Sequence, residues 1–319
     1  MLRVLRRGAS AFEQPACGDD FHIPDDAVWL DLIEPNRVEE LAVESALKVQ
    51  LPTREDMAEI EPSSRLYQAD SNTFLTAVVL TNAEAALPQT APVTFVLAGD
   101  QLIAIRYVEP KSFALFCSQA LRQPWLCQTG ASTFLNLLDA IVDRAADILE
   151  HTAADIEAVN QSIFAEPRSR DFGQCVFRLG RVQNVNAKIR DSLGSLARLI
   201  GFAALARQID GNQEHRDQLG SLNHDVQSLI DHSSYLGSNI AFLLDAALGF
   251  INIEQSNISR RFSVVAVVFL PPTLVASTYG MNFEHMPELG WLFGYPYALA
   301  LMASSVAAAL LIFHRRRWL

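Results

Sequence analysis

Two uncharged apolar segments near the C-terminus constrain this chain more than any other feature. They cover residues 262–279 and 295–313, and neither contains Asp, Glu, Lys, Arg or His. A helix rises about 1.5 Å per residue, so each segment is long enough to cross roughly 30 Å of hydrocarbon. Because only the short loop 280–294 joins them, the pair predicts a membrane hairpin that returns the chain to the side from which it entered.

The basic residues that flank these segments predict the orientation of the hairpin. Arg260 and Arg261 precede the first segment, residues 315–317 are all arginine, and the loop contains neither Lys nor Arg. Positive residues concentrate on the cytoplasmic side of membrane proteins. We therefore expect both termini in the cytoplasm and the loop outside.

Charge and motifs exclude two classes of function for the part that precedes the hairpin. Of the whole chain's 36 acidic and 25 basic residues, the hairpin and tail hold only Glu284, Glu288 and three arginines. The acidic remainder argues against nucleic acid as a partner, because nucleic-acid binding depends on cationic contacts to phosphate. No P-loop, HExxH or GxSxG motif is present, so we do not expect an enzyme. The four cysteines form no CxxC pair and are expected to be free thiols.

The first 130 residues have the pattern of a mixed α/β domain. The Gly99-Asp100 pair predicts a hairpin turn, and Asn36 can cap a helix over 37–49. The spacing of Val38, Leu41, Ala42 and Ser45 supports this helix. Short apolar or β-branched runs predict strands at 27–35, 75–80, 92–99 and 101–108.

From residue 131 onwards the pattern changes to long helices. We expect them at 132–164, which ends at Glu166-Pro167, at 171–209, and at 214–279. The last would be on the order of 100 Å long and would continue into the membrane. It has an apolar seam that, on an isolated helix, would be exposed, and this predicts packing between copies of the chain. The seam consists of Leu229, Leu236, Ile240, Leu243, Ala247 and Phe250.

The expected fold is therefore an α/β cytoplasmic domain followed by a helical stalk or funnel and a two-helix transmembrane hairpin. The segments are 1–130 (α/β domain), 131–261 (long helices and stalk), 262–279 (first transmembrane helix), 280–294 (periplasmic loop), 295–313 (second transmembrane helix) and 314–319 (basic cytoplasmic tail).

The sequence around the loop resembles a known family. TYGMNFEHMPEL, at 278–289, resembles the signature of the CorA family of divalent-cation channels. The preceding FSVVAVVFLPPTLVAS, the following WLFGYP and the C-terminal HRRRWL also match its magnesium-transporting members. The similarity is dense from about residue 249 to the C-terminus and weaker before it.

This resemblance implies a homopentamer in the bacterial inner membrane with a cytoplasmic funnel. The first transmembrane helix of each subunit would line one axial pore, and the second would face lipid. Such proteins conduct Mg²⁺, and often Co²⁺ or Ni²⁺, and they close when cytosolic Mg²⁺ is high.

A selectivity filter is expected at Gly280, Met281 and Asn282. Mg²⁺ gives up its water reluctantly, so a ring of neutral amide oxygens could hold the hydrated ion without trapping it. Alternatively, Asn282 only caps the helix end beside a left-handed Gly280. Glu284 and Glu288 in the loop are expected to raise the local concentration of cations, although they could equally be solvated loop residues.

The first transmembrane segment contains a stripe with steps of three and four residues, which predicts a pore-lining face. Thr273 and Ser277 would offer hydroxyls, while Phe262 and Leu270 would form hydrophobic constrictions. A lipid-facing or helix-facing stripe is the alternative. Pro271 and Pro272 predict a bend or free carbonyls in this helix.

Asp245 is a candidate regulatory metal ligand, as an acidic ring in the funnel, or else a solvated residue of the helix. Two other interpretations of the whole chain stay open. One is a CorA-superfamily zinc transporter similar to ZntB, and the other is a sensor or scaffold that uses the hairpin only as an anchor. Polar residues on the stripe would have no role in an anchor.

Overall fold

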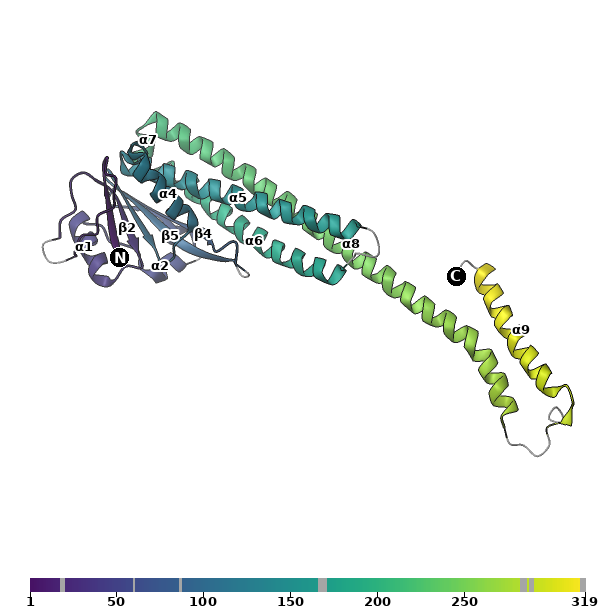
Figure 1. Ribbon diagram of the computed structural model, residues 1–319. Helices are drawn as coiled ribbons and strands as arrows, with labels where there is room; N and C mark the ends of the chain where they lie inside the picture. Colours follow the sequence, from purple (N-terminus) through teal and green to yellow (C-terminus); the bar gives the residue numbers. More distant parts are fainter. Residues whose placement is uncertain are drawn as a thin grey trace. The chain divides into compact units, whose positions relative to one another are not determined.

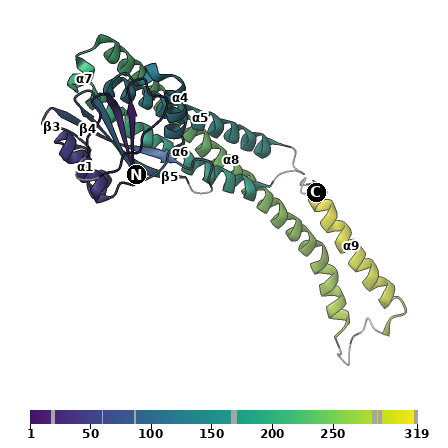
Figure 2. The same ribbon diagram turned by 60° about the vertical axis from the view of Figure 1, so that its left-hand side comes forward.

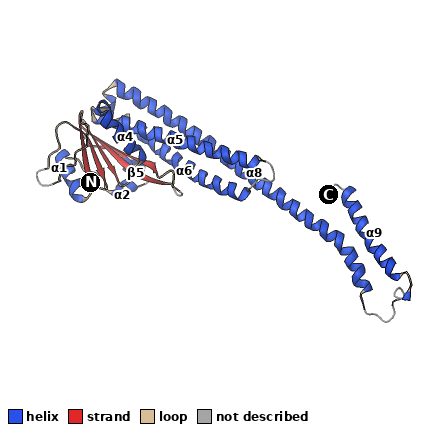
Figure 3. Ribbon diagram, in the orientation of Figure 1, coloured by secondary structure: helices blue, strands red, loops and turns tan. Residues whose placement is uncertain are grey.

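The computed structural model describes residues 1–17, 21–59, 61–85, 88–165, 171–281, 286 and 290–315. The chain divides into two compact units, Met1–Leu244 and Asp245–Leu319. The first unit contains a β-sheet and a set of helices, and the second is helical (Figures 1 and 3).

A six-stranded mixed sheet forms the centre of the first unit, with the order β1-β2-β6-β5-β4-β3. β2 and β6 are parallel, and all other neighbours are antiparallel. The strands are β1 (Leu2–Arg6), β2 (Ala27–Ile33), β3 (Leu66–Ala69), β4 (Asn72–Thr81), β5 (Gln89–Ala98) and β6 (Gln101–Arg106).

All four predicted strands are confirmed, and two further strands, β1 and β3, were not predicted. In the predicted hairpin, Ala98 lies opposite Gln101, and Gly99 has a φ of 57°, which glycine adopts without strain. β1 and β3 gave no comparable signal, because β1 interrupts its apolar residues with arginines and β3 has only four residues.

The first helix, α1 (Arg37–Leu47), confirms the predicted helix and its Asn36 cap, but two of the residues whose spacing supported it are exposed. Asn36 accepts a hydrogen bond from the Glu39 amide, and Glu39 bonds back to the Asn36 amide. Val38 and Leu41 are 59% and 46% exposed, whereas Val43 is buried. The helix ends before residue 49 because Lys48 adopts a left-handed conformation with a φ of 53°.

The sheet is covered on both faces, because alternate residues of a strand point in opposite directions. Leu30 and Val96 belong to a core shared with Val43 of α1 and with Met57 of α2 (Arg54–Ala58), which precedes the one-turn α3 (Pro62–Arg65). On the other face, the Phe95 ring lies 6.2 Å from the Phe113 ring of α4 (Lys111–Arg122) and 5.4 Å from the Phe134 ring of α5 (Gly130–Phe164). A short 3-10 helix, η1 (Pro124–Cys127), joins α4 to α5.

α6 (Phe172–Ala203) protects an open edge of β4. β3 pairs with β4 only as far as Leu75, so the backbone of Val78 is free on that side. The Val78 amide donates to Ser195 Oγ at 3.0 Å, and Ser192 Oγ donates to the Val78 carbonyl at 2.8 Å. Two serines of α6 thus replace the missing strand and satisfy this edge.

The prediction of one helix over 171–209 is wrong at its C-terminal end. α6 ends at Ala203, and a separate one-turn helix, α7 (Arg207–Asp210), follows. The amides of Leu205 and Ala206 bond to carbonyls three residues earlier, which tightens the last turn and ends the α-helix.

The long helix α8 (Gln213–Tyr279) confirms the third predicted helix and belongs to both units. Within the first unit it runs beside α5 and α6 (Figures 1 and 2). Asn186 of α6 and Ser233 of α8 exchange two buried hydrogen bonds of 3.0 Å. The predicted seam is buried at Leu236, Ile240 and Leu243 within a single chain. The seam therefore does not require an oligomer, contrary to the argument from sequence.

The second unit contains the end of α8 and α9 (Gly294–Arg315). Both helices are long and apolar enough to cross a membrane, and only 6% and 17% of their most apolar windows are buried. A core helix of a soluble protein would be mostly buried instead. The predicted spans 262–279 and 295–313 lie within these two helices, and α8 continues through Pro271 and Pro272.

Candidate ion-conduction site

The C-terminal end of α8 carries the first residues of the predicted filter. The Gly280 amide donates to the Ala276 carbonyl at 2.9 Å, and the Met281 amide donates to Thr278 at 3.4 Å. The alternative role of Asn282, as a helix cap, assumed that Gly280 is left-handed. Gly280 does not have a positive φ, so that assumption is wrong. A Cβ at this position would lie 3.0 Å from the Ala276 oxygen, so a larger residue would crowd the last turn.

The rest of the predicted outer site lies outside the described residues. This applies to Asn282, Glu284 and Glu288. Their roles in the filter and in cation recruitment therefore stay predictions.

The predicted pore stripe is accessible along α8 in a single chain. Phe262 and Leu270 are 72% and 66% exposed, and Thr273 and Ser277 are exposed as well. The spacing of these four residues places them on one side of the helix. Their assignment to a pore stays a prediction, because a single chain contains no axial pore.

Thr273 is prepared to accept hydrogen bonds. Its hydroxyl donates to the Phe269 carbonyl at 2.7 Å, so its single proton is already used within the helix. The lone pairs of the oxygen remain available, and water molecules around a cation present their protons outwards. Thr273 therefore offers the type of group that a hydrated cation needs.

A polar continuation of the stripe was only partly recognised from sequence. Asn252, Ser256, Ser259 and Ser263 are exposed at steps of four, three and four on α8. Asp245 is exposed seven residues before Asn252, which places the two on the same helical face. Hydropathy does not mark this run, because its residues are polar and most of them precede the apolar segment.

The first unit contains a charged cluster that sequence analysis missed. Asp31 of β2 accepts two hydrogen bonds of 3.0 Å from Arg106 of β6, and it also pairs with Arg3 of β1. The Arg106 guanidinium lies 4.8 Å from the centre of the Phe113 ring. Burial and the charge of Asp31 raise the pKa of the nearby Cys117 thiol to about 11. The cluster ties three strands together and contains no group set up for chemistry on a ligand.

The cysteines confirm the expectation of free thiols. Cys17, Cys117, Cys127 and Cys175 are all unpaired, and burial raises the pKa of Cys127 to about 11. Among the described residues no group of three or more His, Cys, Asp or Glu side chains is arranged to hold a metal ion.

A covered α/β domain, long helices and two C-terminal apolar helices define a membrane protein with a large extramembrane part. Within that class, the chain belongs to the CorA-like Mg²⁺ transporter protein family, whose model matches residues 24–315. It is 34% identical over 294 residues to the magnesium transport protein CorA of Salmonella typhimurium, with 92% of each chain covered. The CorA of Escherichia coli K12 is likewise 34% identical, over 293 residues.

Solved structures support the same fold. The complete CorA magnesium transporter of Methanocaldococcus jannaschii matches with a TM-score of 0.80 at 16% identity, covering 100% of this chain and 99% of that one. The full-length CmaX protein matches with a TM-score of 0.70 at 17% identity, covering 99% and 97%. At these identities the likeness establishes the fold alone.

Proposed function

We propose that this protein is a channel that lets Mg²⁺ enter the cell through an axial pore formed by five copies of the chain. The observation that carries the proposal is the similarity over nearly the whole length to relatives named as magnesium transport proteins. In this proposal the segment 262–279 lines the pore, the loop 280–294 lies outside, the segment 295–313 faces lipid, and both termini lie in the cytoplasm.

Exposed apolar side chains on α8 support assembly of several copies. Tyr235 and Phe242, one heptad apart, are 63% and 60% exposed, and Leu248 and Ile253 are 47% and 58% exposed. These residues lie outside the seam that the chain buries internally. Neighbouring copies in a ring would cover them, and such burial favours association at about 25 cal/mol per Å² of apolar surface.

Hydrated Mg²⁺ would pass a column of acceptors and constrictions. Gly280, Met281 and Asn282 would select the hydrated ion at the outer end, where Glu284 and Glu288 recruit cations. The Thr273 hydroxyl oxygen, whose proton is already donated to Phe269, would accept hydrogen bonds from the water shell. Neutral acceptors bind a divalent ion weakly enough to release it.

The inner part of the column would contain the gate. Phe262 and Leu270 would close the pore by excluding water, and the rings of Asn252 and Asp245 would lie further inwards. Binding of cytosolic Mg²⁺ near Asp245 would favour the closed state and would limit uptake when internal Mg²⁺ is high. Co²⁺ and Ni²⁺, which also carry tightly held water, are proposed as further substrates.

Ion flux into proteoliposomes tests this proposal. The reconstituted protein should let Mg²⁺ enter vesicles that contain a Mg²⁺-sensitive dye, and Asn282→Ala should change the rate or the selectivity. Competition with Co²⁺, Ni²⁺ and Zn²⁺ would separate a magnesium channel from the alternative of a zinc transporter. A protein that is monomeric after reconstitution, or that conducts no divalent ion, would instead support the membrane-anchored sensor or scaffold.

A further inference from the structure

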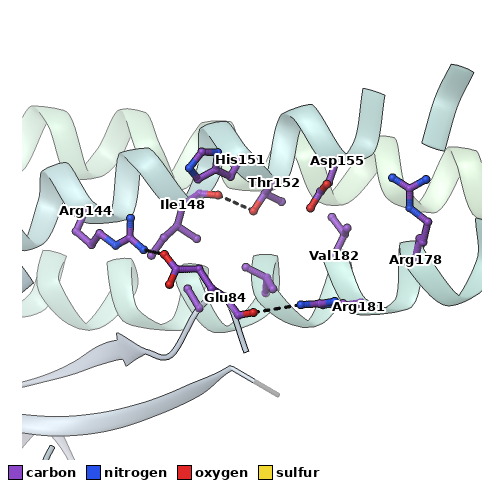
Figure 4. Close-up of a pocket in the computed structure, with 11 residues that line it drawn as sticks. Glu84, Arg144, Ile148, His151, Thr152, Asp155, Arg178, Arg181 and Val182 are labelled. Atoms are coloured by element: carbon purple, nitrogen blue, oxygen red, sulfur yellow. Dashed lines mark hydrogen bonds and ion pairs between the residues drawn. The ribbon is translucent and has the colours of Figure 1, made fainter. Parts of the chain in front are cut away.

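A cavity in the first unit lies between α5, α6 and the turn that follows β4 (Figure 4). Its volume is about 310 Å³, at the lower end of the range of small-molecule sites. The ionisable side chains that line it are Glu84, Arg144, His151, Asp155, Arg178 and Arg181. The channel proposed above uses none of them.

One wall of the cavity is apolar. Ile148 of α5 and Val182 of α6 are buried and line the cavity. Thr152 is buried too, and its hydroxyl donates to the Ile148 carbonyl at 2.7 Å, so this donor is used within α5. The wall can therefore accommodate an uncharged organic group but offers it little hydrogen bonding.

Glu84 forms ion pairs with two cationic side chains at one end of the cavity. A single oxygen, Oε1, pairs with Lys111 Nζ at 2.9 Å and with an Arg144 guanidinium nitrogen at 2.7 Å. The hydrogen bonds and charges of Lys111 and then of Arg144 hold the pKa of Glu84 below its usual value. This carboxylate therefore stays ionised. Arg144 also pairs with Asp147 at 3.7 Å, so the charges of these four groups balance.

Arg178 and Arg181 lie one turn apart on α6 and supply the excess positive charge of the cavity. Arg181 donates to the backbone carbonyls of Glu84 at 3.3 Å and Ala85 at 3.5 Å, which satisfies hydrogen bonds without neutralising the guanidinium. In the part of the chain that the structure describes, no carboxylate lies within ion-pair distance of either arginine. Asp155 is the only other acid that lines the cavity there, so the local balance is positive in a chain of net charge −11.

We propose that this cavity binds the phosphate group of a small phosphorylated organic molecule. The planar guanidinium of Arg178 can donate two parallel hydrogen bonds to phosphate oxygens, and Arg181, one turn along α6, adds a second positive charge to the lining. The wall at Ile148 and Val182 receives the organic part. A nucleoside monophosphate has both features, and so does the headgroup end of an anionic phospholipid.

Calorimetric titration of the full-length protein in detergent, without divalent cations, tests the site independently of ion transport. The probes are adenosine monophosphate, adenosine, inorganic phosphate and a short-chain phosphatidic acid. Adenosine monophosphate should bind more tightly than phosphate, and adenosine should not bind. Arg178→Gln should weaken binding at least about tenfold, because charged hydrogen bonds are lost.

Arg190→Gln is the matched control. Arg190 is exposed on the same helix, and nine residues from Arg181 it lies on the opposite face. This variant should bind like the wild type, and the melting temperatures of both variants should match that of the wild type because both side chains are exposed.

The remaining outcomes decide the source of the phosphate or reject the site. Binding of phosphatidic acid alone, lost in Arg178→Gln, would keep the site and assign it to a lipid headgroup. Absence of binding of every phosphate probe at millimolar concentration would overturn the proposal. So would equal weakening by both substitutions, or adenosine that binds as tightly as its monophosphate.

Discussion

Arg106 and Asp31 form a fully buried ion pair with two parallel hydrogen bonds of 3.0 Å, although 75 residues separate them in the sequence. Asp31 lies on β2 and Arg106 on the parallel strand β6. The pair lies on the sheet face that α4 covers, where Phe113 contacts the guanidinium. Water cannot solvate either charge there, so Arg106 depends on Asp31 for its counter-charge, while Asp31 also pairs with Arg3.

Asp31→Asn should destabilise the protein strongly. The change leaves Arg106 buried without its counter-charge, and loss of one partner of a buried pair typically costs about 3–5 kcal/mol in the free energy of unfolding. Thermal or denaturant unfolding of the purified protein measures the loss. Arg7→Gln is the control, because Arg7 pairs with Asp100 on the surface, where a pair contributes about 0–1 kcal/mol. Equal effects of the two substitutions would contradict this account.

Two helical glycines should respond to alanine in opposite directions. A Cβ at Gly130 would lie 2.3 Å from the backbone carbon of Gln101, so Gly130→Ala must push α5 away from β6 and should cost about 1–3 kcal/mol or more. At Gly220 in α8 a Cβ would meet nothing within 4 Å, and alanine has the higher helix propensity. Gly220→Ala should therefore stabilise the protein by about 0.5–1 kcal/mol. Unfolding curves of both variants check the signs, and destabilisation by Gly220→Ala would contradict the open surface at this position.

The pore assignment predicts different effects for two similar threonines. Thr273 lies on the predicted stripe, while Thr278, whose hydroxyl likewise donates to a carbonyl one turn earlier at 2.8 Å, lies on another side of α8. Thr273→Val keeps the shape but removes the acceptor, and loss of one neutral hydrogen bond, about 1 kcal/mol, corresponds to about fivefold in rate. Mg²⁺ flux into proteoliposomes should fall in Thr273→Val and stay unchanged in Thr278→Val and Thr273→Ser. Equal flux in all three would remove Thr273 from the pore.

The sequence revealed local and periodic features better than long-range ones. The length of the two uncharged segments predicted both apolar helices. The helix cap at Asn36 and the turn at Gly99 depend only on residues nearby in the sequence, so they could be predicted as well. The Asp31–Arg106 pair had no local signal, because strand order alone brings the two residues together. The exposure of Val38 and Leu41 could not be predicted, because helical spacing shows which residues share a face but not which face the sheet covers.

The candidate site shows the same division. The stripe of Phe262, Leu270, Thr273 and Ser277 followed from spacing, whereas the hydrogen bond that orients the Thr273 hydroxyl depends on which rotamer the side chain adopts. The proposed role of Asn282 depends on several copies of the chain arranged around an axis. Neither the periodicity of the sequence nor the structure of a single subunit shows such an arrangement. Family resemblance alone pointed to that residue.

A group of acids on α5 and α8 predicts a pH-dependent stability. Desolvation raises the pKa of Asp139 first, and the charges of Asp143 and Asp225 raise it further. The pKa of Asp143 is raised in the same way, with Asp147 and Asp225 as the charged neighbours. Raised pKa values mean that the folded chain binds these protons more tightly than the unfolded chain. The acids therefore lower the free energy of unfolding at neutral pH, and the penalty disappears as the pH falls through the folded pKa values towards 3.8.

Asp139→Asn should consequently stabilise the protein at pH 7 and have little effect near pH 4. Asp139 is exposed in the chain, so screening limits the gain to at most about 1 kcal/mol. Melting temperatures at both pH values, with a chelator present to exclude divalent cations, measure the difference. Asp191→Asn, which removes an exposed carboxylate of α6, is the control and should change neither value. A lower melting temperature for Asp139→Asn at pH 7 would mean that this carboxylate is stabilised by a cationic partner rather than repelled by Asp143 and Asp225.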